Sequence, residues 1–449
     1  MYALFHHRRL TSSRLSLKLV LFSLLSILQV VVSQDAVGQD AYKLVVSTDR
    51  ESAIYKIDEV AKFRVSVTKG SQPVTEGKVI YVVDDFITDH PAKADFPKGD
   101  IQLSEKSDVS VTSSSPGFLR ILVTYQSPDK KIQAIAAAAF SPEKIEASMP
   151  VPEDFDEFWD EQKKQLAAVA PTATLSPVEQ EDATLECFDV QVACLGGAPV
   201  SGYLARPTNA KAKSLPAILW VHGAGVRGSS LPAAIKGAKA GMLSMDINAH
   251  GLPNGKPGEF YRDQNSGPLN NYRYMGRESR DTIYFRGMYL RLVRAIDFLT
   301  AQPEWDGKNV VVIGHSQGGG QALVAGGLDP RVTFVATGVP AICDHSGRAA
   351  GRINGWPKLV PTLDNGKPDP TILQAARYVD AVNFASRCRA DAIMSVGFID
   401  SVCPPSSCYA AYNNLKGAKQ IITEPLMGHA APQHIQDAFF KQVQKHVQD

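Results

Sequence analysis

The sequence predicts an α/β protein in which a mostly parallel, doubly wound sheet is preceded by a small all-β sandwich of immunoglobulin type. Three observations support this prediction. Short alternating strands without a long helical window fill residues 42–147. From residue 150 onward, buried apolar runs alternate with amphipathic helical segments. One such run, 310–313, leads into the sharp turn Gly-His-Ser-Gln-Gly at 314–318.

Residues 1–33 have the pattern of a secretory signal peptide. A basic segment that includes Arg8 and Arg9 precedes an apolar run at 19–32, and the small residue Ser33 follows. The apolar run is short for a membrane span and is interrupted by polar residues. We therefore expect export to the periplasm or the extracellular space, with an uncleaved membrane anchor as the alternative.

Composition limits the classes of partner. Charged residues make up 21% of the chain and the formal net charge is +1, so the sequence predicts no nucleic-acid partner. Six cysteines are too few for a disulfide-built scaffold of this length, and the pairing of Cys403 with Cys408 stays open. No Cys/His spacing is typical of a zinc site, and we predict neither a metal nor a cofactor.

The first globular domain is expected at residues 40–147. Alternating runs such as 61–67 and 117–125 are separated by clusters of Gly, Ser and Pro, which is typical of a β-sandwich. No aromatic cluster in this part is distinctive enough to predict a carbohydrate-binding platform. A spacer, or a prop between domains, is the favoured role.

The second domain is expected at residues 150–449. It opens with a helical stretch whose aromatic residues share one face, typical of core packing. The apolar strand 215–221 then ends in the turn His-Gly-Ala-Gly at 222–225. The segment 252–281 is rich in Gly, Pro, Asn, Tyr and Arg and lacks periodicity, so we expect a long loop that borders the site.

Ser316 is the candidate nucleophile. A strand, the pattern Gly-x-Ser-x-Gly and a small-residue helix form the context of a nucleophile elbow. Side chains at Gly314 or Gly318 would strike neighbouring backbone in so sharp a turn. The alternative is an ordinary glycine-rich turn.

Asp400 and His429 complete a candidate catalytic trio. Each lies just after a predicted strand, and the chain order Ser, Asp, His is that of the α/β-hydrolase fold. A serine hydroxyl needs an imidazole to take its proton, and the imidazole needs a carboxylate to fix its tautomer. His345 precedes the acid and His434 lies within the last helix, so both are weaker candidates for the base.

Two backbone groups are candidates for the oxyanion hole. The residue after the nucleophile supplies one N–H in this fold, and a turn after an upstream strand supplies the other. These groups are the backbone N–H of Gln317 and that of Ala224. We expect His222, beside Ala224, to support its turn or pack in the core rather than act as the base.

The chain resembles the acetyl xylan esterases and cephalosporin-C deacetylases of carbohydrate esterase family 7 over residues 150–449. The resemblance rests on Ser316-Gln-Gly-Gly-Gly, Leu328-Asp-Pro-Arg-Val, Asp400-Ser-Val-Cys-Pro-Pro-Ser and Gly428-His429. It implies that Ser316, Asp400 and His429 form the catalytic triad and that the N–H groups of Ala224 and Gln317 form the oxyanion hole.

The chain departs from this family in two ways. It has Asn-Ala-His at 248–250 where the family usually has Arg-Gly-Gln, and Ala224 where the family has an aromatic residue. The family also usually lacks an N-terminal β-domain and often forms ring-like hexamers, so the homo-oligomeric state of this chain stays open.

These observations predict an exported serine esterase. Its expected substrates are acetylated xylan, xylo-oligosaccharides or similar acetylated sugars, cleaved through an acetyl-enzyme intermediate. A carboxylesterase or peptidase of the same fold is the nearest alternative, because fold alone does not specify a substrate. A non-catalytic surface protein that binds glycans is the alternative from another class.

Overall fold

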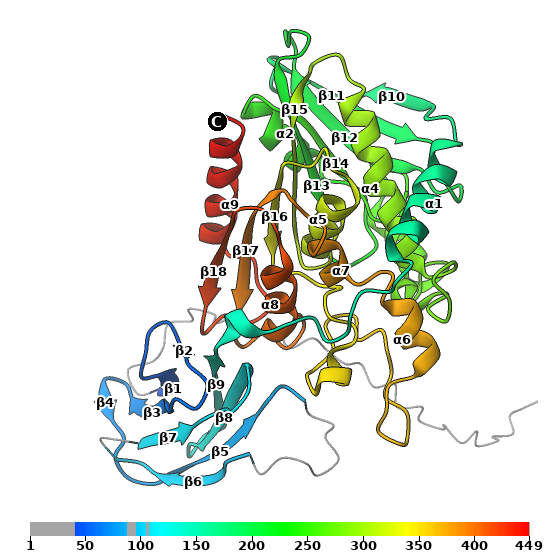
Figure 1. Ribbon diagram of the computed structural model, residues 1–449. Coiled ribbons are helices and arrows are strands. Elements are labelled where there is room, and N and C mark those ends of the chain that lie inside the picture. Colours follow the sequence, from blue (N-terminus) through cyan, green and yellow to red (C-terminus); the bar gives the residue numbers. More distant parts are fainter. Residues whose placement is uncertain (1–40, 88–95, 105–106, 449) are drawn as a thin grey trace, which may run out of the picture.

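The computed structural model describes residues 41–87, 96–104 and 107–448. A nine-stranded sheet with helices on both faces forms the larger part, and two smaller sheets lie at one end of it (Figure 1). The predicted fold class, an α/β-hydrolase fold preceded by a small all-β sandwich, is confirmed. The predicted signal peptide, residues 1–33, lies outside the described residues.

The N-terminal sandwich consists of two mainly antiparallel sheets. The first contains β1 (Tyr42–Thr48), β3 (Ala61–Lys69), β4 (Gln72–Pro73) and β7 (Ser107–Val111). The second has the order β2 (Ile54–Tyr55), β9 (Lys131–Phe140), β8 (Gly117–Gln126), β5 (Lys78–Asp84) and β6 (Lys98–Gln102). Alternate residues such as Phe63 and Ile121 point into the core between the sheets, as the period-two pattern predicts.

Strand β9 is buried on both faces over its alanine-rich half. Ala136 and Ala138 pack in the core of the sandwich, whereas Ala137 and Ala139 pack in a core that is continuous with the helices of the larger part. Small side chains on both faces let the sandwich approach the catalytic region closely. The run of alanines therefore marks the contact between the two parts.

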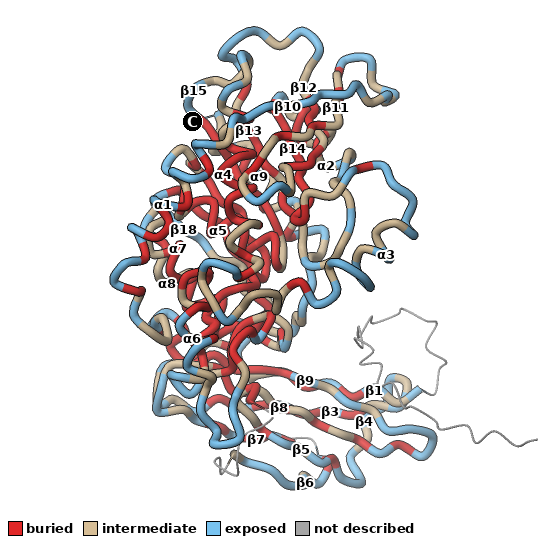
Figure 2. Tube along the Cα trace, turned by 90° about the vertical axis from the view of Figure 1, so that its right-hand side faces the viewer, coloured by how far each residue is buried: buried red, intermediate tan, exposed pale blue. Residues whose placement is uncertain are grey.

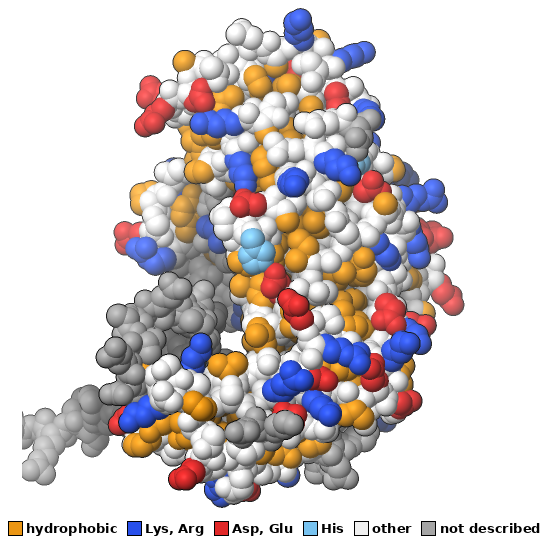
Figure 3. Space-filling model, turned by 90° about the vertical axis from the view of Figure 1, so that its left-hand side faces the viewer, with side chains coloured by type: hydrophobic (Ala, Val, Ile, Leu, Met, Phe, Trp, Pro, Cys, Tyr) orange, Lys and Arg blue, Asp and Glu red, His pale blue; other side chains and the backbone are white. Residues whose placement is uncertain are grey.

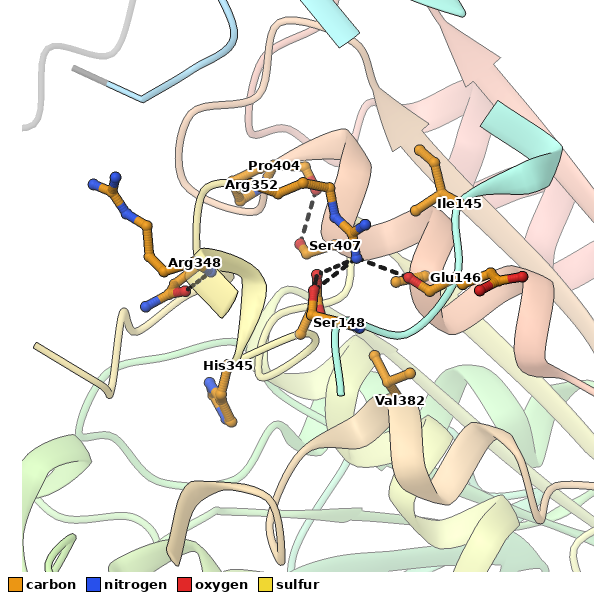
Figure 4. A network of polar contacts seen from close by, with 12 residues as sticks. Ile145, Glu146, Ser148, His345, Arg348, Arg352, Val382, Pro404 and Ser407 are labelled. Atoms are coloured by element: carbon orange, nitrogen blue, oxygen red, sulfur yellow. Dashed lines mark hydrogen bonds and ion pairs between the residues drawn. The ribbon is translucent and has the colours of Figure 1, made fainter. Parts of the chain in front are cut away.

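A polar cluster fixes the connecting segment, which includes the 3₁₀ turn η1 (Pro142–Lys144) (Figure 4). The Nη2 atom of Arg352, just beyond η3 (Gly347–Ala350), donates to the Glu146 carbonyl and to Ser148 Oγ, each at 2.7 Å. It also pairs with Asp344 Oδ2 at 3.0 Å. One guanidinium thus ties the connection to the larger part.

The large sheet has one antiparallel edge and six consecutive parallel strands. The antiparallel pairings join β10 (Ala173–Pro177), β11 (Leu185–Val192), β12 (Val200–Pro207) and β14 (Leu243–Ile247) in that order. From β14 the parallel order is β13 (Leu215–Val221), β15 (Trp305–His315), β16 (Phe334–Gly338), β17 (Asp391–Gly397) and β18 (Lys419–Glu424). The carboxyl ends of these parallel strands meet at one edge, where such folds place their sites.

Side chains of β15 alternate between the two helical layers. Val310 and Val312 pack in the core beneath α1 (Phe155–Ala167), α4 (Tyr284–Thr300), α5 (Gln317–Leu328), α7 (Ala381–Ala385) and α8 (Pro405–Asn414). Val311 and Ile313 pack on the other face against α9 (Gln433–His446), which shares that face with α2 (Leu231–Lys239) (Figure 1). A strand buried on both faces has a continuous apolar run in its sequence, and residues 310–313 form such a run.

The expectation of a purely irregular segment at 252–281 was wrong in part. This segment contains α3 (Gly258–Ser266) and the 3₁₀ turn η2 (Tyr272–Tyr274). Helix α3 buries none of its residues and lies at the surface (Figure 2). Because it has no apolar face, hydrophobic periodicity could not reveal it.

The surface seen in Figure 3 carries positive and negative side chains interspersed over hydrophobic ones rather than gathered by sign. In the described part of the chain, no helix is long and apolar enough to cross a bilayer. All six cysteines are free and buried, so Cys403 and Cys408 do not form a disulfide.

Candidate active site

The turn at Ser316 joins the end of β15 to the start of α5. Ser316 has φ 58° and ψ −123°, a backbone conformation that costs a non-glycine residue free energy. Its N–H donates to the Gly338 carbonyl at 2.8 Å, and its carbonyl accepts from the Ala341 N–H at 2.9 Å. The neighbouring strand β16 and the loop after it therefore hold the strained residue in place.

Glycines allow the close approach of this turn to β13. A Cβ on Gly314 would lie 2.5 Å from the Gly318 backbone, and one on Gly318 would lie 2.2 Å from the Val221 carbonyl oxygen. Real Cβ atoms do not approach backbone so closely. Glycine is therefore required at 314 and 318 for steric reasons, as predicted from the sequence.

His429 lies within hydrogen-bond distance of both Ser316 and Asp400. The His429 Nε2 atom is 2.9 Å from Ser316 Oγ, and its Nδ1 atom is 2.8 Å from Asp400 Oδ2. The three residues come from the carboxyl ends of β15, β17 and β18. Parallel strands of one sheet thus bring together residues that are up to 113 positions apart in the chain.

The surroundings of Asp400 define the proton positions in this chain of contacts. Asp400 is fully buried, and its Oδ1 atom accepts from the N–H groups of Val402 and Cys403 at 2.8 and 2.9 Å. A carboxylate held by two N–H donors accepts a third bond at Oδ2, so His429 Nδ1 carries the proton. The Nε2 atom is then the acceptor for the Ser316 hydroxyl, the arrangement that makes a serine nucleophilic.

The turn that carries Ala224 lies beside Ser316. A Cβ on Gly223 would be 3.5 Å from the Ser316 Cβ atom, and Ala224 itself is exposed. Gln317 is the first residue of α5, whose first N–H groups have no acceptor within the helix. The turn that carries Ala224 and the start of α5 therefore both adjoin Ser316.

The model of the family described as acetyl xylan esterase (AXE1) matches residues 142–446. The chain belongs to the acetyl xylan esterase family. It is therefore a carboxylic ester hydrolase, in agreement with the geometry around Ser316. The match begins at residue 142, so the N-terminal sandwich lies outside it.

Relatives of known name support the assignment. The chain is 32% identical over 322 residues to the acetyl esterase Axe7A of Xylanibacter ruminicola, a match that covers 71% of this chain and 72% of the relative. The structure of acetyl xylan esterase 1 from Thermoanaerobacterium sp. JW/SL YS485 aligns with a TM-score of 0.60 and 25% identity, over 68% of this chain and 97% of that one. The acetyl xylan esterase from Paenibacillus sp. R4 has the same fold, with a TM-score of 0.59, 24% identity, and coverage of 68% and 98%.

One group of side chains in the described part of the chain has a composition that suits a metal ion. Candidate ligand atoms of Asp400, Cys403 and His429 all lie within 4.8 Å of one another. Both carboxylate oxygens of Asp400 already accept hydrogen bonds, and a cation would displace the one from His429. These contacts suit a hydrogen-bonded pair of Asp400 and His429 better than they suit a metal centre.

The weaker base candidates lie away from this chain of contacts. His345 is buried, and neither of its ring nitrogens has a hydrogen-bond partner among the described residues. His434 is on α9, where its Nε2 atom pairs with Glu424 Oε1 at 2.7 Å. Of these histidines, His429 alone contacts the Ser316 hydroxyl.

Sequence reasoning missed two residues next to the elbow. Tyr272, in the segment 252–281, donates its hydroxyl to Gln317 Oε1 at 2.6 Å. His250 packs against Tyr272 with ring centroids 4.6 Å apart. The only sequence signal for His250 was the departure from the Arg-Gly-Gln pattern at 248–250, and Tyr272 had none beyond its position in a long segment.

Proposed function

We propose that this protein is an exported serine esterase that removes acetyl groups from acetylated xylan, xylo-oligosaccharides or similar acetylated sugars. The single observation that carries the proposal is the continuous chain of contacts Ser316–His429–Asp400 on a strained turn, in a member of the acetyl xylan esterase family. The names of the relatives, an acetyl esterase and two acetyl xylan esterases, support an acetyl group as the acyl part.

The first half of the reaction forms an acetyl-enzyme. Ser316 Oγ attacks the acetyl carbonyl carbon while His429 Nε2 takes the hydroxyl proton. The backbone N–H groups of Ala224 and Gln317 donate to the oxygen that becomes negative, and Asp400 stabilises the imidazolium. The C–O bond to the sugar then breaks, and Nε2 returns the proton to the leaving sugar oxygen.

The second half releases acetate. A water molecule attacks the ester carbonyl of the acetyl-Ser316 group, and His429 Nε2 accepts a proton from that water. The same two N–H groups stabilise the second tetrahedral oxyanion. When it collapses, Ser316 Oγ leaves, takes the proton back from His429, and the enzyme is restored.

The sequence of residues 1–33 supports the export that we propose. A basic segment followed by an apolar run and a small residue is the pattern of a cleaved signal. We further propose that residues 40–147 and 150–449 are separate domains of the mature protein. Mass spectrometry of protein recovered from the periplasm or medium tests cleavage near Ser33, because an uncleaved chain would retain the N-terminal peptide.

The direct test compares the wild-type protein with Ser316→Ala. We expect hydrolysis of a chromogenic acetyl ester and release of acetate from acetylated xylan, with both activities reduced by about 10⁴-fold or more in the variant. Circular dichroism shows whether the variant is folded. Cleavage of the small ester without release of acetate from xylan, xylo-oligosaccharides or other acetylated sugars would contradict the proposed substrate. Undiminished activity in a folded Ser316→Ala protein would contradict the proposed nucleophile.

A further inference from the structure

Two histidine rings hold the backbone on either side of Ala224. The Nδ1 atom of His222 lies 2.6 Å from the Gly223 carbonyl oxygen, and the Nε2 atom of His250 lies 3.2 Å from the Gly225 carbonyl oxygen. A carbonyl oxygen only accepts, so each of these ring nitrogens carries a proton and donates it. We call His222 and His250 the histidine clamp.

His222 acts on the peptide group that matters for the reaction, and His250 holds the carbonyl of Gly225 on the other side of Ala224. The carbonyl of Gly223 and the N–H of Ala224 belong to one planar, trans peptide unit, in which they point in opposite directions. Holding the carbonyl oxygen on His222 therefore sets the direction of the Ala224 N–H. A rotation of this unit would remove the first oxyanion donor without altering the side chains of Ser316, His429 or Asp400.

Each ring of the clamp is itself held by a second contact. The Nε2 atom of His222 accepts the Ala249 N–H at 3.1 Å, and the Nδ1 atom of His250 is 2.7 Å from the Tyr284 hydroxyl. Because its Nε2 atom accepts a backbone N–H, His222 is neutral and has its proton on Nδ1. The Tyr284 hydroxyl can donate or accept, so the neutral form of His250 follows from its burial rather than from this contact. The carbonyl of Ala249 in turn accepts from the buried guanidinium of Arg291 at 2.7 Å.

Tyr272 connects the clamp to the second oxyanion donor. Its ring packs edge-on against His250, and its hydroxyl donates to the side-chain Oε1 of Gln317 at 2.6 Å. The Gly225 N–H approaches the same hydroxyl at 3.5 Å. One tyrosine thus contacts both the loop that carries Ala224 and the residue that supplies the other backbone N–H.

We propose that His222, His250 and Tyr272 are positioning residues that fix the Ala224 N–H relative to the Gln317 N–H and so preform the oxyanion hole. The inference rests on the proposed function, in which these two N–H groups stabilise the tetrahedral intermediate. None of the three residues touches the reacting atoms; each acts through the backbone or through Gln317.

The charges around the clamp favour neutral rings. Burial is the largest cause that lowers the pKa of His222 to about 3 and that of His250 to about 4, and the cation of Arg227 adds to both effects. Arg291 acts on His250 in the same direction. The phenol groups of Tyr272 and Tyr284, which face His250, are uncharged at neutral pH, and burial raises their pKa values further above it.

The test measures kcat, KM and the affinity for a tetrahedral analogue, such as a small alkylboronic acid that bonds to Ser316. In His250→Leu we expect kcat to fall by about 10²-fold, the loss typical of one oxyanion donor, while KM changes by less than about threefold. Affinity for the boronic acid should fall in parallel with kcat/KM. His250→Gln, whose amide can still donate to the Gly225 carbonyl, should recover at least a tenth of the wild-type kcat.

Tyr272→Phe keeps the ring and removes only the hydroxyl, so it tests the proposal even if His250→Leu does not fold. We expect kcat about tenfold lower with KM unchanged, because Gln317 loses one hydrogen bond. His434→Gln, on the outside of α9, is the matched control and should keep the wild-type kcat.

Two results would overturn the inference while leaving the proposed function intact. One is a folded His250→Leu or Tyr272→Phe protein with kcat within twofold of wild type. The other is a loss of kcat without a matching loss of affinity for the boronic acid. An active Ser316→Ala protein would instead contradict the proposed function itself, so the two failures are distinguishable.

Discussion

The ring of Phe118, in strand β8 of the N-terminal sandwich, packs edge to face on the ring of Phe398, with centroids 5.1 Å apart and an interplanar angle of 71°. Phe398 is fully buried and lies two residues before Asp400. Phe118 also contacts Tyr409 of α8, at 5.7 Å. The sandwich thus supports the segment from which the carboxylate of the candidate triad projects.

Replacing Phe118 by Ala should weaken both stability and catalysis. Removal of a buried Phe side chain costs about 3–5 kcal/mol, and here the cavity would open beneath the Asp400 segment. We therefore expect a lower urea midpoint together with a lower kcat for the chromogenic acetyl ester. Both are measured on the purified full-length chain.

Phe63→Ala is the matched control for that variant. Phe63 is equally buried, but it lies in the core of the sandwich and not in the core shared with the larger part. It should lower the stability of the sandwich while the folded protein keeps its kcat. Equal effects of the two substitutions on kcat would contradict a specific support of Asp400 by Phe118.

Arg352→Ala should loosen the connection between the two parts. The guanidinium binds the Glu146 carbonyl, Ser148 Oγ and the buried Asp344 carboxylate, which would lose its ion pair (Figure 4). We expect the free energy of unfolding to fall by about 3 kcal/mol, because a buried carboxylate is left without its cation. Urea denaturation measures it.

Arg352→Lys and Arg262→Ala complete that experiment. A lysine restores the charge and has three N–H donors, but its side chain is shorter, so its ammonium reaches the three acceptors of Arg352 Nη2 less well and recovery should be partial. Arg262 is exposed on α3, and its removal should change stability by less than about 0.5 kcal/mol. Full recovery with lysine would mean that a cation with N–H donors is sufficient, and that the reach of the guanidinium is not needed to hold the connection.

Gly338→Ala should impair the elbow. A Cβ at this position would lie 1.8 Å from His315 Nδ1, and the His315 ring is stacked on Phe439 at 5.2 Å. The Gly338 carbonyl also accepts the Ser316 N–H, so a backbone shift at 338 moves the nucleophile. We expect a loss of about 1–3 kcal/mol and a reduced kcat.

Gly117→Ala is the control for this steric argument. A Cβ on Gly117 would meet nothing within 4 Å. Activity and stability should therefore stay close to wild type, as measured by ester hydrolysis and thermal unfolding. If Gly338→Ala behaved like Gly117→Ala, the space around Ser316 would be less restricted than the structure shows.

Acid should destabilise the protein below about pH 6.5. Burial lowers the pKa of His222 and His345 to about 3 and that of His250 and His315 to about 4. The unfolded chain binds these protons near pH 6.5 and the folded chain does not, so the free energy of unfolding falls as pH drops from about 6.5 to about 4.

Two buried carboxyls change the free energy of unfolding with pH in the opposite direction. Burial raises the pKa of Asp246 and Asp380 to about 7, so the folded protein keeps their protons between about pH 4 and pH 7 and is favoured as pH falls through that window. Below about pH 6, the destabilising effect of the four histidines exceeds the stabilising effect of the two carboxyls. Urea denaturation at a series of pH values should therefore show stability decreasing from pH 6 to pH 4, and a flat profile would contradict it.

His345→Leu isolates one part of this pH dependence. The buried His345 ring has two nitrogens without a hydrogen-bond partner among the described residues, which costs free energy that a leucine of similar size avoids. We expect a gain of about 1 kcal/mol at pH 7 and a larger gain at pH 5. A less stable variant at both pH values would show that His345 has a structural role that its contacts do not reveal.

Much of the fold could be predicted because its signals are local. The apolar run 310–313 predicts a buried strand, and the glycines on either side of Ser316 are required by backbone that lies within a few residues or on the adjoining strand. Chain order alone made His429 a better candidate than His345, since an acid must precede the base in this fold. Helix α3 escaped prediction because its polar residues leave no periodic apolar face.

The sequence by itself determined the class of fold, the strained turn at Ser316 and the order in which an acid and a base follow it. Only the tertiary structure decided that His222 and His250 hold the peptides around Ala224, and that Phe118 lies against Phe398. The physical reason is that periodicity reports whether a side chain is buried but not which distant residue it meets. Those partners are set by how the strands and loops pack once the whole chain has folded.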